Sequence, residues 1–498
     1  MKNLSKRKTG RIILFIFLAE LFSIFAYFLP NFGQIAFFII AGAVLVLTLI
    51  KLEYGVWILL AELIIGSKGY LFYFEDSGII ISIRIAIWLI VMAVWLGKLI
   101  NKATHKELNS EASELSSGKY FSYFYYFIIL FLFIAWSAIN GLLNHNGFNN
   151  IFFDLNGWLY FALIFPIAEV LKEKKDIYKL GEIFLASTIW LSFKTFFVLF
   201  FFSHNLFNST LELYQWIRNT GVGEITQIQG GFYRVFFQSH IFILIGFFIF
   251  LIFMDESIKN KNKKNLYSLF FLSSIFLSVI LLSFSRSFWV GLTVGFLFFI
   301  FYILFIYKWR IAIKTITLLL MAGTMSAVLI VAVVKFPYPR PLGGFDTASL
   351  FSDRVSQTNE SAISSRWQLL PPLREAIKEN FILGKGFGAS ITYESKDPRV
   401  LETSADGKYT TYAFEWGWLD IWLKLGIFGL ISYIVLMGKI IYDGLKTKEN
   451  LSSGLAIGLI ILAAVSFFSP YTNHPLGIGY LIIAGMIINL AKSESNLD

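Results

Sequence analysis

A short polar run separates two long apolar stretches of this 498-residue chain at residues 283–289. It reads SFSRSFW, with Arg286 at its centre. An arginine at the bilayer centre costs about 3 kcal/mol or more, so membrane proteins keep one where it meets water, an anion or a ligand. A planar guanidinium binds phosphate oxygens through two parallel hydrogen bonds. Arg286 therefore predicts a diphosphate-binding site at a membrane–water boundary. The alternative is a cation that only anchors a helix end.

A second polar run lies at residues 230–240 and reads GGFYRVFFQSH. Arg234 falls at the mouth of a predicted span over residues 236–254, which makes it a second candidate for binding diphosphate. Gln238 and His240 should follow one turn deeper on the same helix, where polar groups need partners. We count both as candidate substrate-binding residues. For His240 a buried hydrogen-bonding role is favoured over catalysis.

The third group of candidates lies between residues 365 and 415. Arg366 opens a predicted helix and is either a ligand-binding residue or a solvated one. Glu415 stands before Trp416, where the chain re-enters the membrane. A carboxylate there is favoured by the helix dipole, and desolvation would also suit it to act as a general base. The glycines of GKGFG at residues 384–388 are interpreted as turn formers, because no strand–loop–helix context supports a phosphate loop.

The composition predicts the class of protein that contains these residues. The chain is 57% hydrophobic and 15% charged, far more apolar than soluble domains, which predicts an all-α polytopic membrane protein. The net charge of +10 is attributed to membrane topology, and no nucleic-acid partner is expected. The chain has no Cys, and its His residues lack metal-ligand spacing, so neither a metal nor another cofactor is expected. These His residues are at positions 105, 145, 204, 240 and 474.

A hydropathy scan predicts about fourteen transmembrane helices. Lys and Arg gather in alternate connections, so we expect both termini in the cytoplasm and the polar segments around 204–234 and 335–415 on the outer face. The third span is short and is expected to be tilted or re-entrant. The predicted spans are 12–29, 34–50, 54–66, 79–98, 121–142, 157–171, 180–203, 236–254, 266–284, 288–307, 315–334, 416–440, 452–469 and 476–491.

The chain divides accordingly into residues 1–334 with eleven predicted helices, an extracytoplasmic loop at 335–414, and residues 415–498 with three more. A loop that long inside a compact protein is usually functional. It should contain short helices, among them one from Ser365 to Asn380. Pro371 and Pro372 are expected to kink or split this helix.

Taken in order, these motifs resemble the bacterial O-antigen polymerase and O-antigen ligase superfamily. The resemblance covers about residues 232–430. It rests on Arg234, the Ser285-Arg286 pair followed by Trp289, the long outer loop, Ser365-Arg366-Trp367, Asn380 followed by GKGFG, and LGIFGL at 425–430.

The resemblance implies a metal-independent glycosyltransferase in the bacterial cytoplasmic membrane, with its active site on the outer face. Its donor would be an oligosaccharide on undecaprenyl diphosphate, held by Arg234 and Arg286, and its acceptor a second glycan. Ligases of this superfamily are expected to have a His in the large loop, whereas this chain has Glu415 at the matching spacing. This difference favours a polymerase of O-antigen or capsule, with Glu415 as the base and Asp406 and Glu402 as alternatives.

Two other functions stay open at this stage. A ligase would transfer the glycan to lipid A core or protein. A flippase or transporter should instead have inverted repeats around a midplane site, and the sequence contains no such repeat. Besides the bilayer, a chain-length regulator protein is left open as a partner.

Overall fold

The computed structural model describes most of the chain. The described residues are 5–76, 79–104, 122–206, 210–306, 309–346, 350, 361–395, 400–401, 404, 406–447 and 449–495.

Helices make up nearly all of the regular structure. They are α1 (Lys6–Phe28), α2 (Pro30–Ile50), α3 (Leu52–Ile65), α4 (Ile83–Thr104), α6 (Phe124–Leu143), α7 (Phe148–Trp158), η1 (Leu159–Leu163), α8 (Ile164–Val170), α9 (Lys174–Ser203), α10 (Thr210–Asn219), α11 (His240–Lys259), α12 (Lys263–Leu282), α13 (Arg286–Ile306), α14 (Trp309–Val334), α16 (Ser361–Glu379), α18 (Gly417–Lys446), α19 (Asn450–Val465) and α20 (Pro475–Ser495).

Three antiparallel hairpins complete the described structure. They are β1 (Tyr73–Asp76) with β2 (Ile79–Ser82), β3 (Glu224–Gln229) with β4 (Phe232–Phe236), and β5 (Ile391–Glu394) with β6 (Lys408–Thr411).

The predicted all-α polytopic membrane fold is confirmed. Within the described residues, twelve helices are long and apolar enough to cross a membrane, α7, η1 and α8 together forming one of them. Two further predicted spans correspond to α19, with 16 residues, and α3, with 14. At 1.5 Å per residue α3 is about 21 Å long, which is shorter than the hydrocarbon core.

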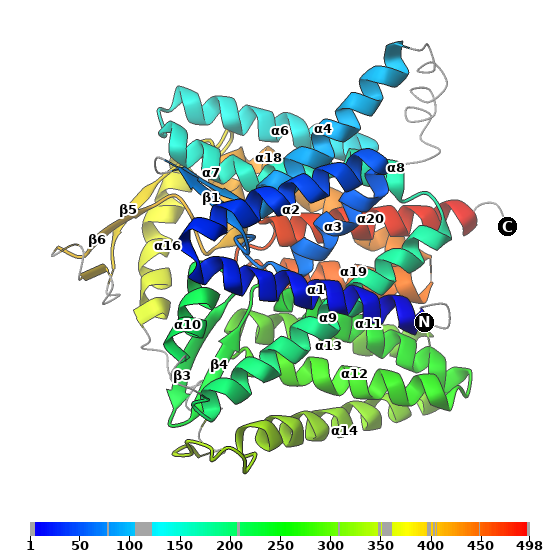
Figure 1. Ribbon diagram of the computed structural model, residues 1–498. Coiled ribbons are helices and arrows are strands. Elements are labelled where there is room, and N and C mark those ends of the chain that lie inside the picture. The colour runs from blue at the N-terminus through cyan, green and yellow to red at the C-terminus, as the bar shows by residue number, and fades with distance from the viewer. Residues whose placement is uncertain are drawn as a thin grey trace.

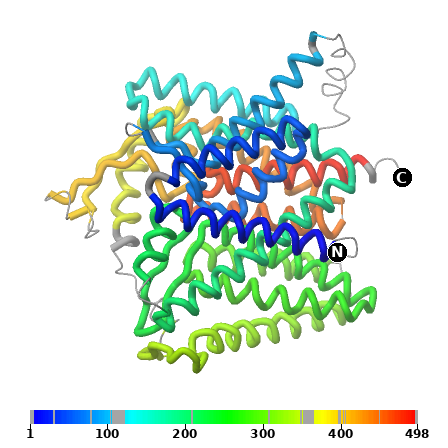
Figure 2. The backbone as a smooth tube through the Cα atoms, viewed as in Figure 1, coloured from blue at the N-terminus to red at the C-terminus, as the bar shows by residue number. Residues whose placement is uncertain are grey.

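The long helices lie side by side, and the two ends of this bundle differ (Figure 1). One end, which we call the hairpin end, has the three hairpins together with α10 and α16. Both chain termini lie toward the opposite end, which we call the terminal end (Figure 2). Residues far apart in the sequence therefore meet at the hairpin end.

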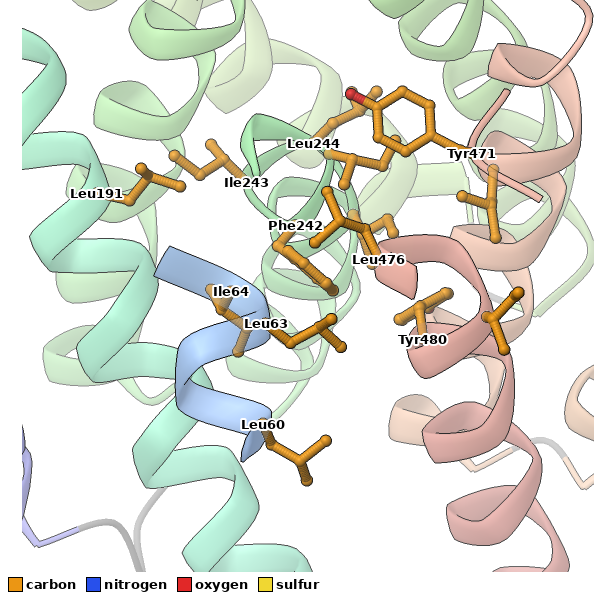
Figure 3. Packing of buried hydrophobic residues seen from close by; sticks show 14 of the residues in the cluster. Leu60, Leu63, Ile64, Leu191, Phe242, Ile243, Leu244, Tyr471, Leu476 and Tyr480 are labelled. Atoms are coloured by element: carbon orange, nitrogen blue, oxygen red, sulfur yellow. The ribbon is translucent and has the colours of Figure 1, made fainter. Parts of the chain in front are cut away.

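Helix α11 lies at the centre of the bundle, since 83% of its spanning window is buried. It packs against α12 and α19. Figure 3 shows Phe242 of α11 close to Leu63 of α3, with Tyr480 of α20 across from them. The first residue of α11 is His240. Because α11 is packed against these helices, it holds the turn before His240 in place.

The β3–β4 hairpin corrects the predicted start of the eighth span. The chain stays extended through Phe236, and α11 begins only at His240. Gln238 therefore lies in the turn before the helix and not one turn inside it. The reason is that β3 and β4 pair with each other on either side of a turn at Gly230 and Gly231. In this pairing Arg234 lies opposite Thr226.

The segment after α14 has a small core of its own at the hairpin end. Leu369 and Leu373 of α16 pack with Ile391 of β5, Phe414 and Leu423. Figure 1 shows α16 running across the ends of the spanning helices. Pro371 and Pro372 lie inside this helix, and it is not split there.

The glycines of residues 384–388 form a turn that packs against α6. All three have positive φ, and a Cβ on Gly386 would lie 2.2 Å from the backbone nitrogen of Gly141. Asn140 donates to the Gly384 carbonyl at 2.8 Å, and Asn146 donates to the Phe387 carbonyl at 2.9 Å. The interpretation of these glycines as turn formers fits this packing.

A buried cation fixes the same turn to α18. Lys424 is 1% exposed and its ammonium donates to Asp154 at 2.7 Å and contacts Asp420 at 2.5 Å. It also donates to the Tyr412 carbonyl at 3.0 Å, three residues before Glu415. Asp154 in turn accepts from the backbone of Gly388. The cluster thus joins α7, α18 and the glycine turn beneath the hairpin end.

Candidate functional site

Arg234 is held on β4 by partners from several directions. Its Nε donates to the Ser283 carbonyl at 2.8 Å, which ties the hairpin to the turn between α12 and α13. Its guanidinium lies 4.9 Å from the ring centroid of Phe236, and Nη1 is 3.9 Å from Glu224. Only 17% of the side chain is exposed. These contacts therefore fix the orientation of the Arg234 guanidinium.

Arg286 is the first residue of α13, directly after the turn that Arg234 contacts. That turn is tight, with Phe284 at a φ of +45°. An open groove of about 390 Å³ begins at Arg286 and continues along α13 past Trp289, Val290, Thr293 and Val294. A charged group thus lies at the mouth of a mostly apolar groove.

Arg366 and Glu415 form an ion pair between α16 and the start of α18. The Trp416 indole fixes the backbone beside it by donating to the Arg366 carbonyl at 3.0 Å. Ser365 and Ser395 share a hydrogen bond of 2.7 Å, which connects α16 to the end of β5. The side chains of Arg366 and Glu415 are 35% and 49% exposed, so both reach solvent.

The three arginines lie close enough to influence one another. Burial lowers the pKa of Arg366, the positive charges of Arg234 and Arg286 lower it further, and Glu224 raises it. Burial also lowers the pKa of Arg234, with Glu224 and Arg286 acting in opposite directions. Guanidinium groups stay charged at physiological pH, and the three cations outnumber the two neighbouring carboxylates, Glu224 and Glu415. An anion with several oxygens would relieve their repulsion.

Glu224 is a member of this cluster that the sequence analysis missed. It lies on β3 opposite Phe236, two positions along the hairpin from the Arg234–Thr226 pair. Such diagonal neighbours are within reach of long side chains. Two glycines between alternating segments are a recognised hairpin signal, and this signal could have placed Glu224 near Arg234.

Gln238 and His240 follow the strand of Arg234, in the turn before α11 and at its first residue. The Gln238 carbonyl accepts from the Tyr471 hydroxyl at 2.9 Å. His240 is fully buried, and its Nε2 is 2.9 Å from the Thr195 hydroxyl. Its Nδ1 accepts from the Phe237 N–H at 3.4 Å, so the ring is assigned as neutral with the proton on Nε2. The structure therefore places His240 in the core and gives it protein partners.

The alternative carboxylates lie elsewhere or outside the described residues. Asp406 is exposed and accepts from Ser404 and from the Lys408 N–H, which lowers the pKa of Asp406. It stabilises the turn leading into β6. Glu402 lies outside the described residues. Over the described part of the chain, no three His, Cys, Asp or Glu residues are grouped so that they could hold a metal ion.

A protein-family model matches the part of the chain that contains several residues of this site. Residues 269–434 match the model described as O-antigen ligase, which confirms the predicted superfamily. The matched region includes Arg286, Arg366 and Glu415, whereas Arg234 and Glu224 precede it. No curated protein matches the chain.

Proposed function

The chain has a region of the O-antigen ligase and polymerase superfamily at residues 269–434, and we propose that it is a polysaccharide polymerase. It would join repeat units carried on undecaprenyl diphosphate into O-antigen or capsule on the outer face of the bacterial cytoplasmic membrane. The hairpin end would be the outer end, with both termini in the cytoplasm. The observation that carries the proposal is the hydrogen bond from Arg234 to the Ser283 carbonyl, which brings β4 to the turn before Arg286. The charges of Arg234 and Arg286 also lower the pKa of Arg366, which brings α16 into the same group.

In this proposal the arginines bind the diphosphate of the donor. An acceptor hydroxyl oxygen forms a bond to the anomeric carbon while the bond from that carbon to the diphosphate oxygen breaks. The electron pair leaves with the diphosphate, and Arg234 and Arg286 stabilise the charge that develops on it. The groove along α13 supports this geometry, because it places apolar surface next to Arg286 for the lipid tail.

Glu415 would accept the proton of the attacking hydroxyl. Its pairing with Arg366 orients the carboxylate, and 49% of the Glu415 side chain is exposed. Transfer from one face of the sugar would invert the anomeric configuration. Arg366 would then contact both the carboxylate and the bound glycan.

A ligase uses the same donor and differs in its acceptor. The segment from 335 to 415 contains no His in the sequence, which favours the polymerase. A transporter is disfavoured by location, because transporter sites lie near the bilayer midplane. Arg234 and Arg366 belong to β4 and α16, which lie at one end of the bundle in Figure 1, and Arg286 is the first residue of α13.

The proposal is tested in cells that lack this gene, complemented with wild type, Arg286→Ala or Arg218→Ala. Arg218 is an exposed cation on α10 at the same end and serves as the matched control. We expect wild type and Arg218→Ala to restore a glycan ladder on a gel, and Arg286→Ala to leave single repeat units.

Other patterns would contradict the polymerase. Full-length polymer that stays on its lipid carrier in the deletion strain would identify a ligase. Repeat units that accumulate on the inner leaflet would identify a transporter.

A further inference from the structure

Two adjoining hollows lie between helices of the bundle, one along its interior and one at the terminal end. The first, the apolar slot, is formed by side chains of α3, α9, α11, α19 and α20. The second, the lysine mouth, is lined by residues that include Lys172, Lys174 and Ser493. Four residues line both hollows, so the two are continuous. These are Ile177, Tyr178, Leu451 and Ile487.

The length of the apolar slot is similar to the depth of one lipid leaflet. Its lining on α11 runs from Phe242 to Phe253, which is about 16 Å at 1.5 Å per residue. Half of a hydrocarbon core about 30 Å thick is about 15 Å. Figure 3 shows Leu60, Leu63 and Phe242 on one side of this space and Tyr480 on the other.

The slot is also suited to hydrocarbon by its chemistry. Its cavity volume is about 170 Å³, and its lining is almost wholly aliphatic or aromatic. Apolar cavities of this size stay dry and bind apolar ligands. An acyl chain in the slot would restore the packing contacts that the lining side chains otherwise lack.

The lysine mouth is suited to an anion. Lys172 and Lys174 precede and begin α9, and both are exposed. Glu449 is the acidic residue in the lining, so cations exceed carboxylates there by two to one. Basic pockets between membrane helices bind the phosphates of anionic lipids. The mouth therefore favours a negatively charged headgroup over a zwitterionic one.

We propose that the apolar slot and the lysine mouth together bind one anionic glycerophospholipid. One acyl chain lies in the slot, and the headgroup phosphate lies between Lys172 and Lys174. None of Arg234, Arg286 and Arg366 lines either hollow, so this proposal does not rest on the proposed function.

The test uses the purified full chain, stripped of lipid in detergent. It is mixed with equal amounts of phosphatidylglycerol and phosphatidylcholine that have the same acyl chains, and retained lipid is measured by native mass spectrometry. We expect phosphatidylglycerol to be retained preferentially. Each lysine near a lipid surface contributes about a fivefold change in affinity, so Lys172→Ala/Lys174→Ala should weaken retention by at least that factor.

Two further variants distinguish binding in the slot from nonspecific attraction of lipid to positive charge. Lys263→Ala/Lys264→Ala removes two exposed lysines at the start of α12 and should leave retention unchanged. Leu451→Trp fills the junction of the two hollows and should reduce phosphatidylglycerol retention although both mouth lysines remain. Size-exclusion profiles matching wild type would show that each variant is folded.

Three outcomes would overturn the proposal. Equal retention of the two lipids would mean that the slot holds only bulk bilayer hydrocarbon. Unchanged retention in Lys172→Ala/Lys174→Ala would remove the lysine mouth from the site. Displacement of phosphatidylglycerol by glycerol 3-phosphate at the same concentration would show that the acyl chain contributes nothing.

Discussion

The ion pair between Arg366 and Glu415 contributes little to the stability of the fold. Both side chains are partly exposed, at 35% and 49%, and exposed pairs contribute about 1 kcal/mol or less. The buried contacts of Lys424 are of a different kind, because its ammonium is enclosed by Asp154 and Asp420. The Arg366–Glu415 pair is therefore not required for stability, which is compatible with the role proposed for Glu415.

The role of Glu415 leads to a prediction about rate. Glu415→Gln keeps the size of the side chain and removes its ability to accept a proton. Loss of a general base typically lowers turnover by about 10²- to 10⁴-fold. We expect a loss of that size in released carrier diphosphate from reconstituted protein, with donor binding retained.

Glu224→Gln is the informative comparison, because this carboxylate also lies at the arginine cluster. A larger loss of rate in Glu224→Gln than in Glu415→Gln would move the base to β3 and contradict the role given to Glu415.

His474 leads to a prediction about pH. Burial lowers the pKa of His474 to about 3, and the charges of Arg84 and Lys68 act in the same direction. The folded protein thus holds this ring neutral, whereas the unfolded chain protonates it below about pH 6.5. The contribution of His474 to the free energy of unfolding is therefore fully present above pH 6.5. It decreases as the pH falls from 6.5 toward 3.

The measurement is the thermal unfolding midpoint in detergent between pH 7 and pH 5, a range chosen because most carboxylates titrate lower. We expect a decrease for wild type and a smaller one for His474→Asn, which can still accept from the Leu476 N–H. Identical pH profiles would argue against a buried neutral His474.

At the scale of elements, the glycine turn positions α16 and α18 relative to α6. Gly386 has a φ of +82°, and an added Cβ would collide with the backbone of Gly141. We expect Gly386→Ala to destabilise the protein by about 2 kcal/mol or more, from backbone strain and overpacking together. Thermal unfolding measures this change.

Gly438→Ala is the matched control on α18. A Cβ there meets nothing within 4 Å, so alanine should be neutral or slightly stabilising. Equal destabilisation by both substitutions would show that the close approach of Gly386 to α6 is unimportant.

The elements differ in how far the sequence predicts them. Long spans such as α11 and α13 are predictable, because crossing a bilayer requires about 20 apolar residues. The β3–β4 hairpin was missed because five or six residues give a weak periodic signal beside such spans. This error also placed Gln238 in a helix and not in the turn before it.

At the scale of the whole molecule, the meeting of Arg234, Arg286 and Arg366 could be anticipated only in part. The predicted membrane topology, which follows from the lysine distribution, puts their segments on one side. Their proximity depends on how β4, the start of α13 and α16 pack, which hydropathy does not encode. Glu224 lies near Arg234 because of the register of the β3–β4 hairpin. The roles of these residues stay a prediction.

The most direct test supplies purified protein in liposomes with a single substrate, the undecaprenyl-diphosphate-linked repeat unit. Because a polymerase uses this molecule as both donor and acceptor, we predict products of two and more repeats with stoichiometric release of the carrier diphosphate. Arg286→Ala should abolish both, and Arg218→Ala should not. A donor that stays intact until a different acceptor is added would contradict the account.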